Sequence, residues 1–396
     1  MFVVLEPVDP NARFHERRAN ARRRRKLRRA AFLLALVTSA ILGGLAVWVT
    51  ARGTSSPVKE ATRRGATQTG ATVKQKSLLP KEIRGIHVTM MLASLEGKLA
   101  EYASLRNEGL NTIELDVKDE NGTVAFSSPE APLADKVGAA GNYYDPASVA
   151  DQLHAQGIYL IGRVAVFEDT VLSTRRPDLA IQRSDGSVWR DNRGLGWSNE
   201  YSKSVWDYNI SIAKAAAKAG FDEIQFDYTR FPSDGPIDSA VWPGKVNESE
   251  SATIARFLKY ASSQLKPFGI RVSVDVFGLA ATNELGVGQS PKKIARVVNA
   301  ISPMVYPSHF GPGQYGLADP QAAPGTTVGY ALSDFKTAIR GSNAELVPWI
   351  QDFTMGRRFT LADIQDEILA VRSSGARGYL LWNASGKYTT GALQPK

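Results

Sequence analysis

The chain repeats one unit many times: an amphipathic helical segment, a glycine, and a short run of residues that favour β-strands. A glycine at the end of a helix supplies the left-handed cap that turns the chain back into a strand. Five such junctions in order predict helices and strands that alternate, and therefore a parallel sheet. The glycines at these junctions are Gly109, Gly157, Gly220, Gly269 and Gly375.

Three further β-rich runs bring the predicted strands to eight, a number typical of a TIM barrel. An open doubly wound sheet is the alternative, but no strand is followed by the Gly-rich phosphate loop of its nucleotide-binding form. About 14 residues follow the last strand, too few for a complete eighth helix. We therefore predict one (β/α)8 TIM barrel without a full eighth helix. The predicted strands are 84–89, 112–117, 158–167, 223–228, 270–276, 301–306, 346–351 and 378–382, and the helices include 94–108, 202–219, 251–265 and 360–374.

The net charge of +9 comes from two segments near the start of the chain. Residues 1–29 carry +7 and residues 51–81 carry +6, so residues 82–396 carry −4. Because the predicted barrel is mildly acidic, we expect no binding to nucleic acid.

Between the two basic segments, residues 30–50 contain no charge and are long enough to cross a bilayer. The arginines before them should stay on the cytoplasmic side. We predict a basic cytoplasmic tail (1–29), a transmembrane anchor (30–50), a flexible linker (51–81) and an extracytoplasmic barrel (82–396). The alternative is a signal peptide cleaved near residue 51, which would release a secreted protein, although residues 30–50 exceed a typical signal sequence.

Several kinds of catalytic site are absent from the sequence. There is no cysteine, which excludes disulfides and thiolate metal sites. The four histidines form no metal-binding pair at helical spacing, and neither HExxH nor GxSxG occurs. We predict no metal and no cofactor, and a zinc or serine hydrolase is not expected.

Acidic residues alternate with apolar residues in several predicted strands. In 223–228 the polar residues are Glu223, Gln225 and Asp227, and Pro232 follows soon after. In a barrel one face of each strand points inward, so the polar members should face the interior and Asp227 should lie at the carboxyl end, where parallel barrels keep their active sites. The same alternation directs further side chains inward: Glu114, Asp116, Lys118, Arg163, Ser273, Asp275, Phe277 and either Gln351 or Asp352.

Carboxylates that share a partly dry pocket have pKa values that are driven apart, so one stays protonated while another is anionic. Cleavage of a glycosidic bond requires such a pair. The competing interpretation is that Asp116 pairs with Lys118, and Asp227 with Arg163 or Arg230, in structural salt bridges. Because buried ion pairs are weak stabilisers, we favour a catalytic role for the set.

The long connection 168–201 carries aromatic residues suited to stacking on sugars. Trp189 and Trp197 lie beside glycine-rich turns and are the better candidates for this role. Trp206 has helical spacing with Ile210 and should instead pack. His87 and His309 are each as compatible with a structural histidine as with a sugar ligand.

Eight short motifs over residues 83–390 resemble, in order and spacing, the bacterial glycosyl hydrolase domain family catalogued as domain of unknown function 4015. The resemblance implies a TIM barrel distantly like that of the α-amylase group. It further implies that Asp227 matches the nucleophile, that Asp275 stands where a Glu acid/base is usual, and that Asp352 matches a third carboxylate that stabilises the transition state. The motifs are 84–89 (RGIHVT), 116–119 (DVKD), 162–163 (GR), 167–169 (FED), 220–232 (GFDEIQFDYTRFP), 275–278 (DVFG), 303–309 (PMVYPSH) and 349–353 (WIQDF).

Together these observations predict a membrane-anchored glycoside hydrolase that acts on an extracytoplasmic polysaccharide. A non-catalytic binder of cell-wall or capsular glycan and a transglycosylase remain open alternatives. The predicted catalytic residues are Asp227, Asp275 and Asp352. The predicted substrate-binding residues are His87, Asp116, Lys118, Arg163, Trp189, Trp197, Gln225, Tyr228, Arg230, Tyr306, His309, Gln351 and Trp382.

Overall fold

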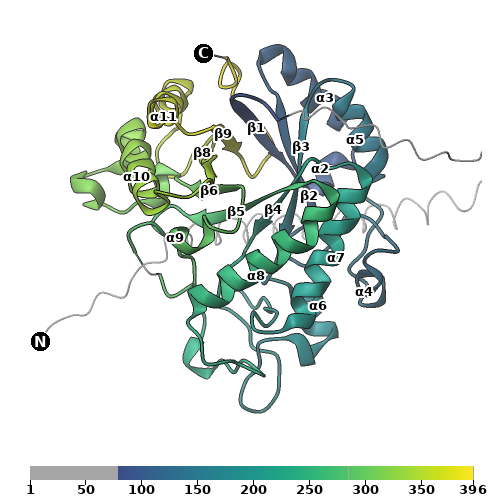
Figure 1. Ribbon diagram of the computed structural model, residues 1–396. Coiled ribbons are helices and arrows are strands. Elements are labelled where there is room, and N and C mark those ends of the chain that lie inside the picture. Colours follow the sequence, from purple (N-terminus) through teal and green to yellow (C-terminus); the bar gives the residue numbers. More distant parts are fainter. Residues whose placement is uncertain (1–78, 284, 396) are drawn as a thin grey trace, which may run out of the picture. The chain divides into compact units, whose positions relative to one another are not determined.

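A computed structural model describes residues 79–283 and 285–395, which form a parallel β-barrel surrounded by helices (Figure 1). The predicted cytoplasmic tail, the predicted membrane anchor and the linker up to residue 78 lie outside the described residues. Within the part that the structure describes, no helix combines the length and apolar character needed to span a membrane.

The described strands occupy eight positions in a closed barrel. They run β5-β4-β3-β2-β1-β9-β8-β6-β7, all their pairings are parallel, and β5 also pairs with β6 to close the ring. The predicted TIM barrel is thus confirmed. The strands are β1 (Ile83–Val88), β2 (Thr112–Lys118), β3 (Tyr159–Ala165), β4 (Glu223–Asp227), β5 (Arg271–Phe277), β6 (Ala300–Met304), β7 (Glu345–Leu346), β8 (Trp349–Gln351) and β9 (Gly378–Trp382).

The predicted seventh strand, 346–351, is divided into β7 and β8, which both pair with β6. Pro348 lies in the gap and lacks the N–H that a ladder requires. The interruption separates the amino-terminal part of this strand from the part that reaches the carboxyl end of the barrel.

The helices form the outer layer, and their caps follow the predicted junctions. Gly220 (φ 107°) ends α7 and Gly375 (φ 75°) ends α11 in the left-handed conformation, which a residue with a Cβ rarely adopts. The predicted helix 94–108 is shorter than expected, because only α3 and a following 3₁₀ turn form there. The helices are α2 (Met90–Ala93), α3 (Lys98–Ser104), α4 (Pro132–Lys136), α5 (Pro146–His154), α6 (Thr170–Arg175), α7 (Lys203–Ala219), α8 (Glu250–Leu265), α9 (Pro291–Ile294), α10 (Pro324–Ala338) and α11 (Leu361–Ser374).

Alternation in the strands separates an apolar sheet–helix layer from a polar barrel interior. Phe226 of β4 faces outward and packs edge-on against Phe257 of α8, with ring centroids 5.5 Å apart. Trp206 of α7 contacts the same ring at 5.8 Å, so its predicted packing role is confirmed. Such interlocking aromatic contacts fix α7 and α8 against β4 and thereby fix the strand that carries Asp227.

No helix follows β9 among the described residues 383–395, in agreement with the expected lack of a full eighth helix. This segment instead packs along the barrel wall. The Tyr379 hydroxyl donates to the Ala392 carbonyl (2.8 Å), and the Tyr102 hydroxyl donates to the Gly386 carbonyl (2.7 Å). The loop therefore covers part of the surface that a helix covers at other positions.

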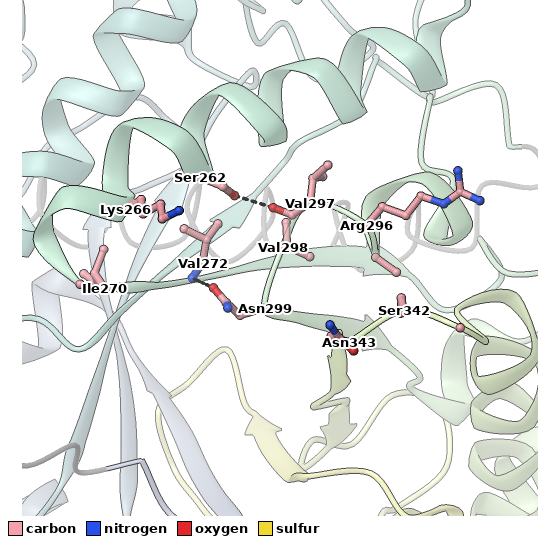
Figure 2. A pocket seen from close by; sticks show the side chains of 13 residues that line it. Ser262, Lys266, Ile270, Val272, Arg296, Val297, Val298, Asn299, Ser342 and Asn343 are labelled. Carbon is pink, nitrogen blue, oxygen red and sulfur yellow. Dashed lines mark hydrogen bonds between the residues drawn. The ribbon is translucent and has the colours of Figure 1, made fainter.

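The two ends of the barrel differ in form. The carboxyl ends of the strands carry long connections, such as 166–202 between β3 and α7. At the amino ends, short connections frame a cavity of about 670 Å³ beside β5, β6 and β7 (Figure 2). Since active sites of TIM barrels lie at the carboxyl ends, the catalytic candidates and this cavity are on opposite faces.

Candidate active site

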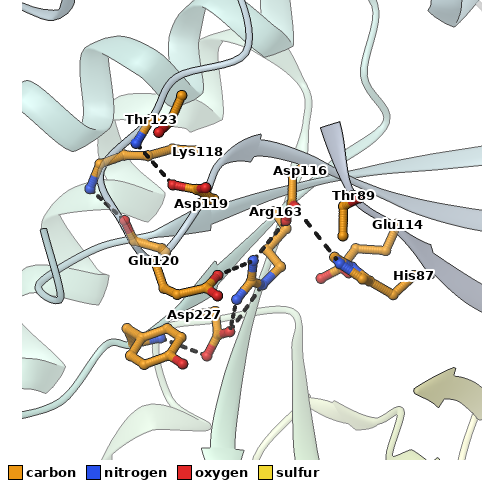
Figure 3. A network of polar contacts seen from close by, with 12 residues as sticks. His87, Thr89, Glu114, Asp116, Lys118, Asp119, Glu120, Thr123, Arg163 and Asp227 are labelled. Carbon is orange, nitrogen blue, oxygen red and sulfur yellow. Dashed lines mark hydrogen bonds and ion pairs between the residues drawn. The ribbon is translucent and has the colours of Figure 1, made fainter. Parts of the chain in front are cut away.

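Arg163 of β3 joins two carboxylates from the neighbouring strands (Figure 3). It donates to Asp116 Oδ1 of β2 at 2.7 Å, and its Nη2 and Nε donate to Asp227 Oδ2 of β4 at 2.6 and 3.0 Å. Glu120 lies 3.6 Å from the same guanidinium. The Arg163 side chain is only 3% exposed, whereas that of Asp227 is 13% exposed. One arginine thus contacts three carboxylates, and Asp227 is the most open of those groups.

The register of the strands explains why these side chains meet. Asp116 pairs with Arg163, and Arg163 pairs with Gln225, so all three point to the same side of the sheet. Asp227 is two residues beyond Gln225 and returns to that inner side. The predicted inward alternation is therefore present in β3 and β4, and in β2 as far as Asp116.

Tyr228 fixes the other oxygen of Asp227. Its backbone has φ 49°, which is uncommon for a residue with a side chain. In this conformation the Tyr228 N–H donates to Asp227 Oδ1 at 2.6 Å. Both oxygens of Asp227 are consequently held, one by the guanidinium and one by the backbone. Left-handed backbone at non-glycine residues is often found at functional sites.

A second group of side chains lies beside Asp116. His87 of β1 is hydrogen-bonded through Nδ1 to Glu114, while its Nε2 lies 3.8 Å from Asp116 Oδ2. The ring of Trp382, at the end of β9, lies 4.5 Å from the His87 ring. All these side chains are at least nine-tenths buried, so the polar interior extends from β4 around to β9.

Asp275 of β5 is a further acidic side chain of this cluster. Its Oδ1 accepts hydrogen bonds from Gln225 Nε2 and from Trp349 Nε1, the latter at 2.8 Å. Because Phe226 pairs with Val274, the next position places Asp227 and Asp275 side by side on adjacent strands. Neighbouring strands are about 4.8 Å apart, so the two carboxyl groups enter the same part of the interior.

The environments of these carboxyls differ. Burial raises the pKa of Asp275 well above its usual range, and the nearby Asp227 and Glu114 charges raise it further. Burial likewise raises the pKa of Glu114 well above its usual range, and it raises that of Asp116 although His87 and Arg163 oppose the change. Burial lowers the pKa of Arg163, but the charges of Asp227 and Asp116 outweigh burial and raise the pKa well above its usual range.

This arrangement can perform acid–base chemistry. Asp227 is paired with the permanent cation of Arg163. Asp275 is dry and close to other acids, which favours its protonated form. An anionic and a protonated carboxyl on adjacent strand positions meet the requirement for glycoside cleavage.

The structure places several predicted site residues in or beside this cluster. Tyr306, which follows β6, is buried, and burial together with the nearby charges of Asp275, Asp227 and Glu114 raises its pKa. His309 lies next to Tyr306, with ring centroids 5.2 Å apart. The predicted residues gathered around the polar interior are His87, Asp116, Arg163, Gln225, Asp227, Tyr228, Asp275, Tyr306, His309, Gln351 and Trp382.

Lys118 does not point inward, contrary to the prediction. The register of β2 and β3 shifts after Asp116, so that Lys118 pairs with the outward-facing Val164. Its ammonium group is fully buried against the helix layer, 3.0 Å from Asn209 Oδ1 and 2.8 Å from Asp169 Oδ2. A β-bulge moved this side chain to the other face of the sheet.

The predicted stacking role does not suit Trp189 and Trp197 in this structure, since they are 0% and 1% exposed. Trp189 Nε1 donates to the Pro236 carbonyl at 3.0 Å and ties the 168–201 connection to the loop after β4. Trp197 lies under Arg230, whose guanidinium is 4.8 Å from the indole ring. Arg230 is itself held among aromatic rings, so these residues support the rim.

Asp352, the predicted third catalytic carboxylate, is not part of the acidic cluster. Trp349 points inward to Asp275, so alternation turns Gln351 inward and Asp352 away. Both oxygens of Asp352 accept hydrogen bonds from Thr389, at 2.8 Å from the backbone N–H and 2.6 Å from the hydroxyl. Of the two residues that could face inward at the end of this strand, Gln351 does so and Asp352 does not.

Three residues of the cluster had no assigned role in the sequence-based prediction. The alternation of β2 predicts that Glu114 points inward but assigns it no function, and within the described part of the chain its Oε1 is buried without a hydrogen-bond partner. Glu120 follows β2 and reaches back to Arg163. Trp349 was regarded only as part of a strand. The acid-rich run 116–120 is the signal that could have identified Glu120. Among residues 79–283 and 285–395, no group of acids and histidines is arranged to hold a metal ion.

Comparison with known proteins gives a family and a fold. Residues 85–388 match the model of a family described as "Putative glycosyl hydrolase domain". No curated protein matches the chain.

Solved structures show the same architecture. The glycoside hydrolase domain of PgaB (BpsB) from Bordetella bronchiseptica aligns with TM-score 0.55 at 14% identity, over 77% of this chain and 95% of that one. The Flavobacterium johnsoniae chitobiase aligns with TM-score 0.50 at 11% identity, over 78% and 47%. A hypothetical protein from Ruminiclostridium thermocellum is 37% identical over 48% of this chain and 97% of its own, with TM-score 0.44. At 14% and 11% identity, the first two show the fold alone.

Proposed function

Because the chain belongs to this family of glycosyl hydrolase domains, we propose that it is a glycosidase that cleaves a glycosidic bond of an extracytoplasmic polysaccharide. The observation that carries the proposal is the contrast between Asp227 and Asp275. These acids occupy adjacent inward positions on β4 and β5, yet only Asp227 is paired with an arginine. Two carboxyls held in opposite protonation states are what the reaction needs.

In this proposal Asp227 is the anionic group, acting as nucleophile or as base. Arg163 donates twice to Oδ2, and the Tyr228 N–H donates once to Oδ1. These contacts fix the carboxylate and leave Oδ1 with a lone pair available to the sugar or to water. Its side chain is 13% exposed, which makes Asp227 the most open of the carboxylates that Arg163 contacts.

Asp275 acts as the proton donor. Gln225 and Trp349 both donate to its Oδ1, which leaves Oδ2 to carry the proton. Burial and the charges of Asp227 and Glu114 raise the pKa of Asp275, so the acid form persists toward neutral pH. The side chain is Asp where related barrels usually have Glu, and the shorter reach places the proton close to the β5 backbone.

Aromatic and polar groups around these acids would bind the sugar. Trp382 and Tyr306 provide ring surfaces with polar tips. Burial lowers the pKa of His309 to about 4, so this imidazole is neutral at pH 7 and can hydrogen-bond a hydroxyl without adding charge. We further propose that residues 30–50, which lie outside the described residues, hold the barrel at the extracytoplasmic face of the cell membrane through the linker.

Products from a glycan panel, measured by mass spectrometry, test the proposal. We expect the native chain to release shorter saccharides, and Asp227→Asn to slow release by about 10³-fold or more. Asp151→Asn, on the exposed surface of α5, is the matched control and should be fully active.

Three other results would each have a clear meaning. Full activity of Asp227→Asn would refute the assignment of this carboxylate. Saturable glycan binding by the native chain without any product would favour the non-catalytic binder. Products longer than the substrate would show that a sugar replaces water as acceptor, which defines a transglycosylase.

A further inference from the structure

The cavity at the amino ends of β5, β6 and β7 is a preformed space (Figure 2). Its walls come from the end of α8, the segment between α9 and β6, and the turn before β7. Its volume of about 670 Å³ is in the range of small-molecule sites, roughly 300–1,000 Å³. It is separate from the acidic cluster, because the two lie at opposite ends of the strands.

Hydrogen bonds hold the cavity walls in place. The Ser262 hydroxyl donates to the Val297 carbonyl at 2.7 Å and joins α8 to the segment before β6. Asn299 and Val272 are joined by two hydrogen bonds. The Val272 N–H donates to Asn299 Oδ1 at 2.9 Å, and the Asn299 backbone N–H donates to the Val272 carbonyl at 2.8 Å. These hydrogen bonds lie within the protein, so its own side chains and backbone position the walls of the space.

The polar groups that line the cavity are mostly hydrogen-bond donors. Lys266 and Arg296 supply two cations, and no carboxylate is among the described lining residues. The Asn299 carbonyl oxygen is already occupied, so its amide NH₂ is the group left for a ligand. The Ser342 hydroxyl is buried without a hydrogen-bond partner in the described part of the chain. A donor-rich, positively charged lining is complementary to an anion with several acceptor oxygens.

The cations of this cavity differ from their neighbours on the same face. Arg271 at the start of β5 pairs with Glu223 and Glu345, and Arg377 before β9 pairs with Glu345. Lys266 and Arg296 have no carboxylate partner among residues 79–283 and 285–395. Since the predicted barrel as a whole is acidic, two unpaired cations around one cavity are a specific local feature.

We propose that this cavity binds an anionic saccharide, that is, a sugar unit that carries a phosphate or a carboxylate. Lys266 and Arg296 would contact the anionic oxygens, and the hydroxyl and amide donors of Ser342, Asn299 and Asn343 would contact the remaining acceptors. The apolar side chains of Val297 and Ile270 suit the C–H face of the sugar ring. The site does not use Asp227 or Asp275, so it stands or falls independently of the proposed hydrolysis.

Isothermal titration calorimetry of the purified full chain in detergent tests the site. The probes are glucose 1-phosphate, glucuronate and inorganic phosphate, each up to about 10 mM, which covers weak affinities. We expect the double variant Lys266→Gln/Arg296→Gln to bind glucose 1-phosphate at least about tenfold more weakly than the native chain, because both charge-assisted contacts are lost.

The matched control is Lys136→Gln/Arg106→Gln, which removes two exposed charges from α4 and the turn after α3. It should bind within about twofold of the native chain, because long-range effects of exposed charges are screened. All the substituted side chains are exposed, and thermal melting verifies that each variant is folded. Weaker binding of inorganic phosphate than of glucose 1-phosphate supports recognition of the sugar, and equal binding identifies free phosphate as the ligand.

Two further results would overturn the proposal. One is the absence of heat with every anionic probe at the highest concentration. The other is an equal loss of affinity in the cavity variant and in the control variant, which would show that net charge alone attracts the anion. A Ser342→Asp chain provides a further check, because a carboxylate placed among the donors should abolish binding while the fold is retained.

Discussion

The charged side chains at the two ends of the barrel differ in their exposure and in their pairing. At the amino ends, Arg271 pairs with Glu223 and Glu345 at 3.1 and 2.7 Å; Arg271 and Glu345 are partly open to water, whereas Glu223 is buried. At the carboxyl ends, Arg163 contacts three carboxylates while it is only 3% exposed. At the amino end the ion pairs are partly exposed and their charges nearly cancel. The carboxyl end is buried and has more acidic than basic side chains.

This difference shows which charges are structural. Exposed ion pairs contribute little to stability, and they mainly keep side chains hydrated and strands in register. A dry cluster with surplus acid destabilises the folded state unless some of its carboxyls are protonated. Such a cluster at the end of a barrel where catalysis occurs is better explained by chemistry than by folding.

Among the substitutions that test this difference between the two ends, Asp275→Asn should have the largest effect. The reaction should slow by about 10² to 10⁴-fold, because the amide cannot donate a proton to the leaving group. Stability at pH 7 should not fall, since the Asn oxygen can still accept from Gln225 and Trp349 and a neutral amide replaces a protonated, neutral carboxyl of similar size. Product assays and denaturant unfolding measure the two quantities. Loss of activity only together with unfolding would contradict the assigned role.

Arg163→Met should destabilise the fold by about 3–5 kcal/mol, because it leaves Asp116 and Asp227 buried without their cation. Equilibrium urea unfolding at pH 7 gives this free energy. The loss should shrink at acidic pH, where the stranded carboxyls are protonated. A variant as stable as the native chain would mean that the carboxyl end is not electrostatically different from the amino end.

The pH dependence of stability tests another acid of the carboxyl end. Glu168, just after β3, is fully buried and contacts Arg193 at 2.6 Å. Burial raises the pKa of Glu168 from an ordinary 4.5 to about 7, so between these pH values the folded chain holds a proton that the unfolded chain has released. Folding stability therefore falls as the pH rises from 4.5 to about 7.

Glu168→Gln should remove this contribution and flatten the pH profile by up to about 3 kcal/mol. Denaturant unfolding at several pH values, for the native chain and the variant, measures the difference between the two slopes. Parallel profiles would show that Glu168 titrates at its ordinary pKa and that this part of the rim is wetter than the structure indicates.

The smallest effect is expected at the amino end. Arg271→Met should lower the free energy of unfolding by less than Arg163→Met does, because Arg271 is partly exposed, the Tyr159 hydroxyl still donates to the buried Glu223, and Arg377 still neutralises Glu345. Added salt should reduce even this change. A loss as large as that of Arg163→Met would abolish the distinction between the two ends.

Local signals were sufficient to predict most of the fold. Glycines at helix ends and alternation within strands depend on nearby residues, and the structure contains eight barrel positions with strand limits close to those expected. The same alternation identified Asp116, Arg163, Asp227 and Asp275 as inward-facing.

The failures have non-local causes. Lys118 changes face because β2 bulges against β3, which the sequence of β2 does not reveal. The burial of Trp189 depends on Pro236, a contact between two long loops. Asp352 follows a strand that is broken around Pro348, and its partner Thr389 belongs to the segment after the last strand. Each error required knowledge of a partner distant in the sequence.

The pairing of β1 with β9 also governs how the barrel can form. Ile83 lies opposite Gly378, so the ring cannot close until the first strand of the barrel pairs with the last. Long-range pairings of this kind slow folding, and an unpaired strand edge invites association with other chains. During synthesis, one side of β1 lacks its final neighbour until β9 has been made. Closure is thus the step at which a nascent chain is most exposed to misassembly, and substitutions that weaken β9 should reduce yield more than they reduce the stability of the finished barrel.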